Sequence, residues 1–183
     1  DVKEFTCDSL LKNMSMVFQN VYLFHDTIEN NIKFGCPDAT HEQVVEAAKK
    51  ACCHDFISAL PQGYDTVIGE GGSTLSGGEK QRISIARAML KDAPIILLDE
   101  ATASVDPENE VHLQQAISAL VKNKTLIVIA HRLSTIRDAD QILVVDNGKI
   151  VEKGVHAELI QQKGIYQKFW NIRQKARNWK LAQ

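Results

Sequence analysis

The first third of the chain alternates between a strand pattern and a helical pattern. Residues 14–18 form a short apolar run that predicts a β-strand, and Gln19 follows it directly. Residues 28–60 repeat apolar side chains at helical spacing. Within that stretch Thr40 and Gln43 have the spacing of a capping box, so a helix is expected to begin there. The pattern predicts a strand followed by a small helical region.

The middle of the chain changes from a glycine-rich stretch to uninterrupted apolar runs. Residues 69–78 are rich in glycine and lead into an amphipathic helix. Residues 95–98 and 126–129 are continuously apolar without alternation, which favours parallel strands covered on both faces. A helix is expected between these strands, with Asp106 as its cap and Pro107 in its first turn.

The last third predicts a hairpin and a helix. Residues 141–146 and 149–153 flank Asn147-Gly148, a dipeptide that strongly favours a two-residue β-hairpin turn. From Gly164 onward the pattern is helical. One stripe of that helix is apolar and consists of Ile165, Phe169, Ile172, Ala176 and Trp179.

Composition limits the classes of function. The 183 residues are 44% apolar, enough for one domain with a sizeable core, and the longest apolar runs are far shorter than a membrane span. A net charge of -2 gives no general reason to expect a nucleic-acid partner. The adjacent Cys52, Cys53 and His54 lack the spacing of a zinc site and are expected to pack in the structure.

Two carboxylates end the first of the buried strands. The segment ILLDE places Asp99 and Glu100 at the carboxyl end of a strand, where open α/β sheets bind ligands. An apolar strand that ends in two acids is common, so this feature alone also fits a solvated strand end. The order of three features removes that ambiguity: LSGGEKQR at residues 75–82, ILLDE, and His131 after the next strand.

This set of motifs in this order closely resembles the ATPase domain of ABC transporters. The segment MVFQNVYLFHDTIENNI at residues 16–32 looks like the exporter version of the loop that contains a metal-contacting glutamine, here Gln19. VIGEGG at residues 67–72 resembles the exporter segment that contacts the membrane domains. The resemblance therefore implies an exporter-type, P-loop NTPase-like α/β fold with a mostly parallel sheet and an inserted helical subdomain.

The resemblance also implies a role for each motif residue. Asp99 would hold Mg²⁺ through water, Gln19 would contact the metal and the attacking water, and Glu100 would be the general base. His131 would donate a hydrogen bond to the γ-phosphate of ATP. The residues expected to contact the ATP of a partner domain or the dimer interface are Ser76, Gly77, Gly78 and Gln81 of the signature motif and Asp106 of the segment at residues 104–106.

Local physics agrees with the signature motif. Ser76 is suited to cap the following helix while Glu79 reaches back to it, and Gly77 and Gly78 let backbone N–H groups approach an anion. A helix N-terminus would then face a phosphate.

One motif of the family does not occur. A phosphate-binding loop reads G-x-x-x-x-G-K-[ST], and no segment of this sequence satisfies it. In the family that loop precedes Gln19, and residues 1–13 resemble the stretch between the two. The chain is therefore expected to be a partial ATPase domain without its N-terminal strands, unable to bind or hydrolyse ATP alone, and with an exposed sheet edge.

Three interpretations of the function remain open. The first is a piece of an exporter ATPase that works with ATP and Mg²⁺, pairs head to tail with an identical or different ATPase domain, and joins transmembrane domains at the cytoplasmic face of the cell membrane. The second is a non-hydrolysing subunit that only lends its signature to a partner. The third is an ABC ATPase of DNA repair or translation, although the segment between Gln19 and the signature is too short for a long coiled coil.

The expected organisation follows from the same resemblance. Residues 1–19 and 93–155 would form a RecA-like core, residues 20–92 a helical and signature subdomain, and residues 156–183 the C-terminal helices. The C-terminal part contains a run of basic residues without an acid, which fits a solvated helix face or, less well, nucleic acid or anionic lipid. The run consists of Lys163, Lys168, Arg173, Lys175, Arg177 and Lys180.

Overall fold

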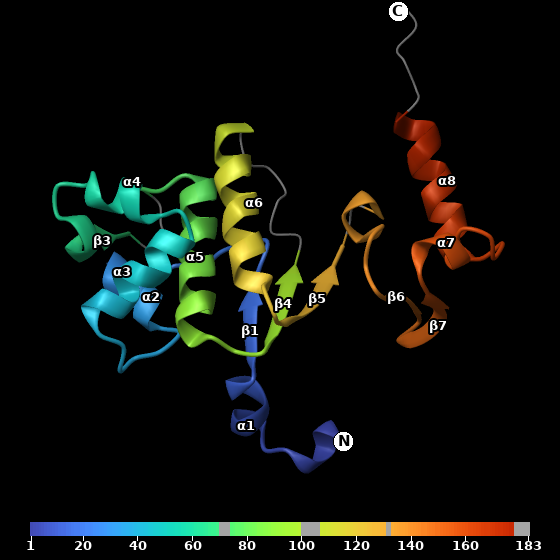
Figure 1. The fold of residues 1–183 in the computed structure, drawn as a ribbon, viewed down its shortest axis with the longest axis horizontal. Coiled ribbons are helices and arrows are strands. Elements are labelled where there is room, and N and C mark those ends of the chain that lie inside the picture. The colour runs from blue at the N-terminus through green and yellow to red at the C-terminus, as the bar shows by residue number, and fades with distance from the viewer. Residues whose placement is uncertain (70–73, 100–106, 131–132, 178–183) are drawn as a thin grey trace, which may run out of the picture. The chain divides into compact units, whose positions relative to one another are not determined.

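The computed structural model describes residues 1–69, 74–99, 107–130 and 133–177, and it divides into two compact units (Figure 1). Unit 1 comprises residues 1–129 and unit 2 comprises residues 130–183. None of the helices within the described ranges combines the length and the apolar character needed to span a membrane.

Unit 1 is built on a parallel three-stranded sheet. Its strand order is β1 (Met14–Val17), β4 (Ile95–Asp99) and β5 (Thr125–Ile129), and all pairs are parallel. Val17 is in register with Leu98, and Asp99 with Ile129, so the carboxyl ends of the three strands lie at the same edge. The sequence prediction of an α/β fold with a parallel sheet is confirmed.

Helices cover one face of this sheet. They are α5 (Gly77–Lys91) and α6 (Pro107–Val121), which pack against each other (Figure 1). Ser15, Val17, Ile96 and Leu98 face them and are buried, because alternate residues of a strand share a face.

The other face of the sheet, and both faces of β5, are less covered than the sequence pattern suggested. Met16 on β1 and all five residues of β5 are exposed. Leu126, Ile127, Val128 and Ile129 keep 36% to 59% of their surface exposed, so the prediction that both faces are covered is wrong for β5. The physical reason is position: among the residues that the structure describes, β5 pairs only with β4, so it is an edge strand with fewer neighbours to cover it.

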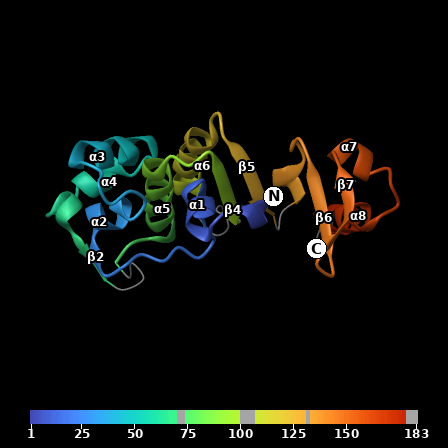
Figure 2. The same ribbon diagram turned by 90° about the horizontal axis from the view of Figure 1, so that it is seen from below.

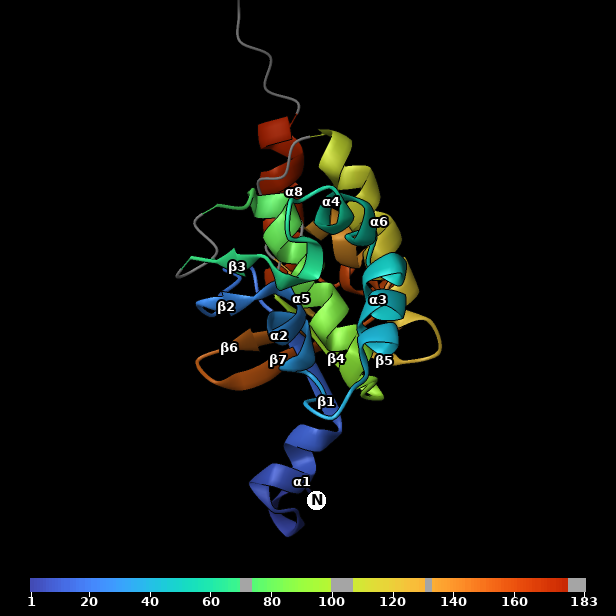
Figure 3. The same ribbon diagram turned by 90° about the vertical axis from the view of Figure 1, so that its left-hand side faces the viewer.

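The helical part of unit 1 consists of three separate helices. They are α2 (Ile28–Lys33), α3 (His41–Lys50) and α4 (His54–Ser58), seen from the side in Figure 3. The predicted capping box of Thr40 and Gln43 begins α3 and is confirmed. A two-stranded ribbon of β2 (Asp26–Thr27) and β3 (Val67–Ile68) lies beside them, and α1 (Cys7–Lys12) precedes β1.

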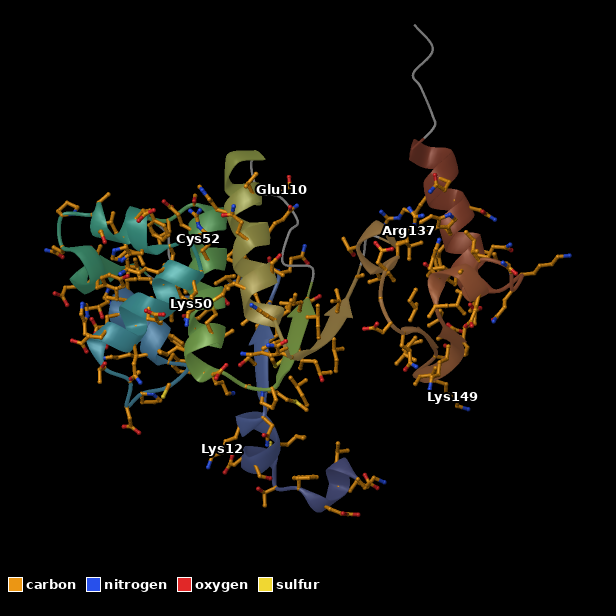
Figure 4. All side chains as sticks on the ribbon, in the orientation of Figure 1. Lys12, Lys50, Cys52, Glu110, Arg137 and Lys149 are labelled. Atoms are coloured by element: carbon orange, nitrogen blue, oxygen red, sulfur yellow. The ribbon has the colours of Figure 1, made fainter. Side chains whose placement is uncertain are left out.

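The cysteines between α3 and α4 pack as expected. Cys53 is fully buried in the core, and this burial raises the pKa of its thiol to about 12. Cys52 lies in the connection between α3 and α4 (Figure 4), and its Sγ is 3.8 Å from Oε1 of Gln115 on α6. His54 Nδ1 is 2.9 Å from the hydroxyl of the buried Tyr64. The three neighbouring side chains therefore have separate structural contacts.

Unit 2 contains a hairpin and two helices. Strands β6 (Ile142–Asp146) and β7 (Lys149–Gly154) pair antiparallel, and Asn147 and Gly148 both have positive φ at the turn, as the sequence predicts. The helices are α7 (His156–Leu159) and α8 (Ile165–Arg177), and Figure 2 shows them beside the hairpin. A small core forms around Ile142, Leu159 and Tyr166.

A close contact between α2 and α5 gives a first prediction. A Cβ atom at Gly35 would lie 2.2 Å from the backbone oxygen of Arg87, whereas a Cβ at Gly77 would meet nothing within 4 Å. Because main-chain atoms cannot move aside cheaply, Gly35→Ala should lower the free energy of unfolding by about 1 to 3 kcal/mol. Gly77→Ala is the matched control, and urea denaturation of both variants measures the difference. Equal stabilities would contradict the tight packing of α2 on α5.

Candidate functional site

The candidate site is formed where the strands of the parallel sheet end. Gln19 comes two residues after Val17, the last residue of β1, and Asp99 is the last residue of β4. Glu100, Asp106 and His131 lie outside the described residues. In the sequence Glu100 adjoins Asp99, and His131 follows Ile129 by two positions. The parallel register brings the ends of β1, β4 and β5, and with them Asp99, to one edge of the sheet.

Helix α5 points its N-terminus to the same edge. Ser15 Oγ donates to the backbone oxygen of Ala88 at 3.4 Å, near the end of α5, and Gln81 near its start bonds to Phe18. The helix therefore runs antiparallel to β1, which Figure 1 also shows. As a result the positive end of the dipole of this 15-residue helix lies beyond the carboxyl end of β1.

The start of α5 is a complete capping box. Ser76 Oγ accepts from the backbone N–H of Glu79 at 3.3 Å, and Glu79 Oε2 accepts from the N–H of Ser76 at 2.7 Å. The prediction that Ser76 caps the helix while Glu79 reaches back is confirmed. Ser76 and Gly77 are exposed, and no atom lies within 4 Å of a Cβ position at Gly77, whereas Gly78 is buried. The first turn is consequently open to a ligand on its Gly77 side.

Gln81 has a structural contact of its own. Its side chain is only 3% exposed, and Nε2 donates to the backbone oxygen of Phe18 at 3.2 Å. Phe18 immediately precedes Gln19, so this bond ties the start of α5 to the segment that contains Gln19. Its predicted contact with ATP remains a prediction, and the structure gives Gln81 a positioning role.

The guanidinium of Arg82 lies on the other side of α5. Its carbon is 5.3 Å from the centre of the Phe56 ring on α4, and the side chain is 5% exposed. This cation–π contact between Arg82 and Phe56 links α5 to α4.

Sequence reasoning did not single out a buried polar cluster that fixes the loop after Gln19. Asn31, 1% exposed, accepts from Phe24 N–H at 2.8 Å and donates to the backbone oxygens of Phe24 and Thr27, both at 3.0 Å. Arg87 donates to the backbone oxygen of Asn31 at 2.8 Å and to its Oδ1 at 3.3 Å. The signal in the sequence is an asparagine four residues after the helix cap Thr27.

Aromatic rings surround the Arg87 side chain. Its guanidinium carbon is 5.8 Å from the centre of the Phe24 ring and 5.4 Å from that of Phe34. Burial lowers the pKa of Arg87 to about 10, so the side chain remains a cation at neutral pH. Tyr22, Phe24 and Phe34 expose 54%, 38% and 62% of their surfaces, and Tyr22 meets Phe24 edge to face. The loop after Gln19 thus presents a rigid aromatic surface.

Comparison with known proteins identifies the family of the chain. The sequence profile of the ABC transporter family matches residues 1–103. The chain belongs to the ABC transporter family. The resemblance drawn from LSGGEKQR, ILLDE and the segment around Gln19 is therefore confirmed.

Relatives within the ABC transporter family include a bacterial flippase and a eukaryotic B family member. The chain is 51% identical over 173 residues to the ATP-dependent lipid A-core flippase of Vibrio cholerae serotype O1, covering 94% of this chain and 30% of that protein. It is 54% identical over 175 residues to the ABC transporter B family member 2 of Dictyostelium discoideum, covering 96% of this chain and 12% of that one.

A solved structure shows the same fold. The structure of a bacterial Atm1-family ABC exporter with ATP bound matches with a TM-score of 0.85 and 44% identity, over 100% of this chain and 31% of that one. The chain thus spans about a third or less of the length of the ABC proteins that it matches.

The candidate site offers one described carboxylate at the end of a strand. Among the residues that the structure describes, no group of three or more His, Cys, Asp or Glu side chains could together hold a metal ion. Asp99 is half-buried at the end of β4 and offers one carboxylate. A single carboxylate suits Mg²⁺, which keeps several waters and binds through one or two carboxylates and substrate phosphates.

The buried asparagine gives a second prediction. Asn31→Ala removes the partner of a buried N–H and of two carbonyl oxygens, and leaving such groups unpaired costs about 1 to 3 kcal/mol. We expect a loss of about 2 to 3 kcal/mol in the free energy of unfolding, measured by urea denaturation. Asn30→Ala is the matched control, because Asn30 is exposed on the same helix and its side chain donates to the exposed Asp26. A similar loss in both variants would show that the loop does not depend on Asn31.

Proposed function

We propose that this chain is the signature-bearing part of the nucleotide-binding domain of an ABC exporter, and that the longer protein to which it belongs uses ATP hydrolysis to drive export. The observation that carries the proposal is the common edge where β1, β4 and β5 end and α5 begins. Parallel register and the Gln81 to Phe18 bond assemble this edge from segments that lie far apart in the sequence.

The residues of this edge have separate proposed roles. Asp99 would hold Mg²⁺ through water, and the metal when bound would neutralise charge on the phosphates. Glu100 would accept a proton from the attacking water, and Gln19 would orient that water. His131 would donate a hydrogen bond to the terminal phosphate. Asp99 ends β4, and in the sequence Gln19, Glu100 and His131 each follow one of the three strands by one or two positions.

The start of α5 would serve a second ATPase domain. Ser76 and Gly77 are exposed at the positive end of a long helix, and the open space beside Gly77 admits an anion close to the backbone. We propose that Ser76, Gly77 and Gly78 contact ATP held by the partner domain, identical or different, and that Asp106 lies at the interface between the two. Gln81 would hold this helix in place through Phe18.

The exposed strand β5 supports the view that the domain has a further part. A strand of a parallel sheet is ordinarily buried on both faces, yet each residue of β5 is exposed. We propose that a strand of the longer protein pairs with the free edge of β5 and brings the phosphate-binding loop that this sequence does not contain. Without that loop, about three or four charge-assisted hydrogen bonds to ATP are lost, at about 1.5 to 3 kcal/mol each, so the chain alone should bind ATP very weakly.

The aromatic surface after Gln19 suits a partner at the membrane. Tyr22, Phe24 and Phe34 are held in place by Arg87 and Asn31, and the segment that begins at Val67 pairs with the same loop through β2. We propose that transmembrane domains dock here, on the cytoplasmic face of the cell membrane. The Gln81 to Phe18 bond would connect their movement to the start of α5.

The third prediction tests the ATPase proposal. ATP binding and phosphate release are measured for residues 1–183 alone and for the protein extended by the upstream segment that its source encodes. We expect negligible activity from the short chain and ATP hydrolysis by the extended protein. Glu100→Gln in the extended protein should reduce turnover by about 10² or more, because it removes the general base.

Other outcomes of this experiment point elsewhere. Tight ATP binding by residues 1–183 alone would contradict the need for a further phosphate-binding loop. An extended protein that binds a partner ATPase domain and remains inert itself would favour a subunit that only supplies its signature. Salt-dependent binding of DNA together with ATP turnover would favour an ATPase of DNA repair.

A further inference from the structure

Helix α8 is fixed to the hairpin of unit 2 by one of its faces. Glu152 on β7 accepts hydrogen bonds from the backbone N–H groups of Ile165 and Tyr166, the latter at 3.1 Å, and so holds the start of the helix. The hydroxyl of Tyr166 is 2.8 Å from Nδ1 of His156, and the ring of Trp170 is 4.4 Å from the same imidazole, centre to centre. Because Tyr166 is only 2% exposed, the face of α8 that carries it is packed inside unit 2 and is not available to a partner.

The outer face of α8 is apolar and uncovered. Phe169 and Ile172 expose 58% and 61% of their surfaces. They belong to the stripe that the sequence shows at Ile165, Phe169, Ile172, Ala176 and Trp179, whose spacing alternates between four and three residues. That alternation is the heptad pattern of a coiled-coil seam.

The width of the stripe distinguishes a protein partner from a lipid surface. At 100° per residue, Ile165, Phe169 and Ile172 of α8 fall within an arc of about 60°. A seam two positions wide per heptad matches one partner helix, whereas a helix that lies in a membrane surface presents a broader apolar face. The stripe therefore fits a helix better than a bilayer.

The charges beside the stripe define the partner further. In the heptad frame of α8, Lys168 falls on one flank of the seam and Arg173 on the other. Residues 163–183 contain no Asp or Glu. Two copies of this helix would bring basic flanks together, parallel or antiparallel, so a second copy is disfavoured by like-charge repulsion. Acidic flanks would be complementary.

We propose that α8 is a docking site for an amphipathic helix of another protein whose apolar seam is flanked by acidic side chains. Glu152, His156 and Tyr166 hold α8 in position, and Phe169 and Ile172 provide the seam. The inference rests on unit 2 alone and is independent of the ATPase proposal. It would stand if the chain proved to be a non-hydrolysing subunit.

The fourth prediction uses two designed peptides. Both are four heptads long with Ile and Leu in the seam, and they differ only in carrying Glu or Lys at every flanking position, which also keeps each from pairing with itself. Fluorescence anisotropy of labelled peptide with residues 1–183 at 0.15 M salt should show the acidic peptide binding at least about tenfold more tightly. The difference should shrink at 0.5 M salt as the charges are screened.

Variants separate the seam from the charges. Phe169→Ser combined with Ile172→Ser should weaken binding of the acidic peptide by at least about tenfold, whereas Asn171→Ser, exposed on the same helix away from the seam, should leave it unchanged. Lys168→Glu should weaken binding of the acidic peptide and strengthen binding of the basic peptide. Because Phe169 and Ile172 are exposed, the double variant should keep the melting temperature of the chain.

The proposal is overturned by any of several results. These are no binding of either peptide, equal binding of both, binding that the double variant leaves intact, and a large loss of melting temperature in that variant, which would mean that the chain itself covers the stripe. Sedimentation is measured in parallel: self-association that the double variant abolishes would assign the seam to a second copy. Seam-dependent binding to vesicles containing anionic lipid, without binding of the acidic peptide, would assign it to a membrane.

Discussion

The packing of α5 against β1 and its neighbouring helices is the constraint on which unit 1 depends. This 15-residue helix contacts α2, α3 and α6 as well as β1, and it is buried over most of its length. Its direction is fixed at two points, by Ser15 near its end and by Phe18 near its start. Because both contacts involve β1, the N-terminus of α5 lies at the carboxyl edge of the sheet.

The buried hydrogen bonds of Asn31 and Arg87 offset the cost of removing these side chains from water and fix the loop after Gln19. Burying Arg87 and Asn31 removes both from water, which is unfavourable unless their hydrogen bonds are met within the protein. The bonds between these residues, Phe24 and Thr27 meet that need and leave little freedom for the loop after Gln19. The same loop follows Gln19, which is proposed to orient the attacking water, and it presents the aromatic surface proposed to meet the membrane domains. The polar cluster of Asn31 and Arg87 therefore links the segment at Gln19 rigidly to the aromatic surface.

The two units use their apolar residues differently. In unit 1 the exposed residues of β5 form the edge of a sheet, where main-chain groups and side chains together can accept a further strand. In unit 2 the exposed residues of α8 form a narrow stripe, and a helix has already satisfied its own main chain, so only side-chain packing and charge can select a partner there. The strand edge of β5 can therefore accept another strand, whereas the helix α8 can accept a partner only through its side chains.

The sequence by itself determined the local features and the family. Capping boxes at Thr40 and Ser76 and the turn at Asn147-Gly148 follow from interactions between residues close in the chain, so they could be predicted without a fold. Motif order identified the ABC ATPase family, because few sequences place LSGGEKQR before ILLDE by chance. The predicted roles of Glu100, Asp106 and His131 rest on that resemblance, since these residues lie outside the described ranges.

Only the tertiary structure decided the long-range contacts. Continuous apolar runs suggested strands covered on both faces, yet β5 is exposed, since periodicity records which residues are apolar and not which neighbours are present. Asn31 and Arg87 are 56 positions apart, and Gln81 and Phe18 are 63 apart, so no local pattern indicated that they bond. Likewise the stripe of α8 was visible in the sequence, but its exposure depends on Tyr166 and Trp170 taking the inner face.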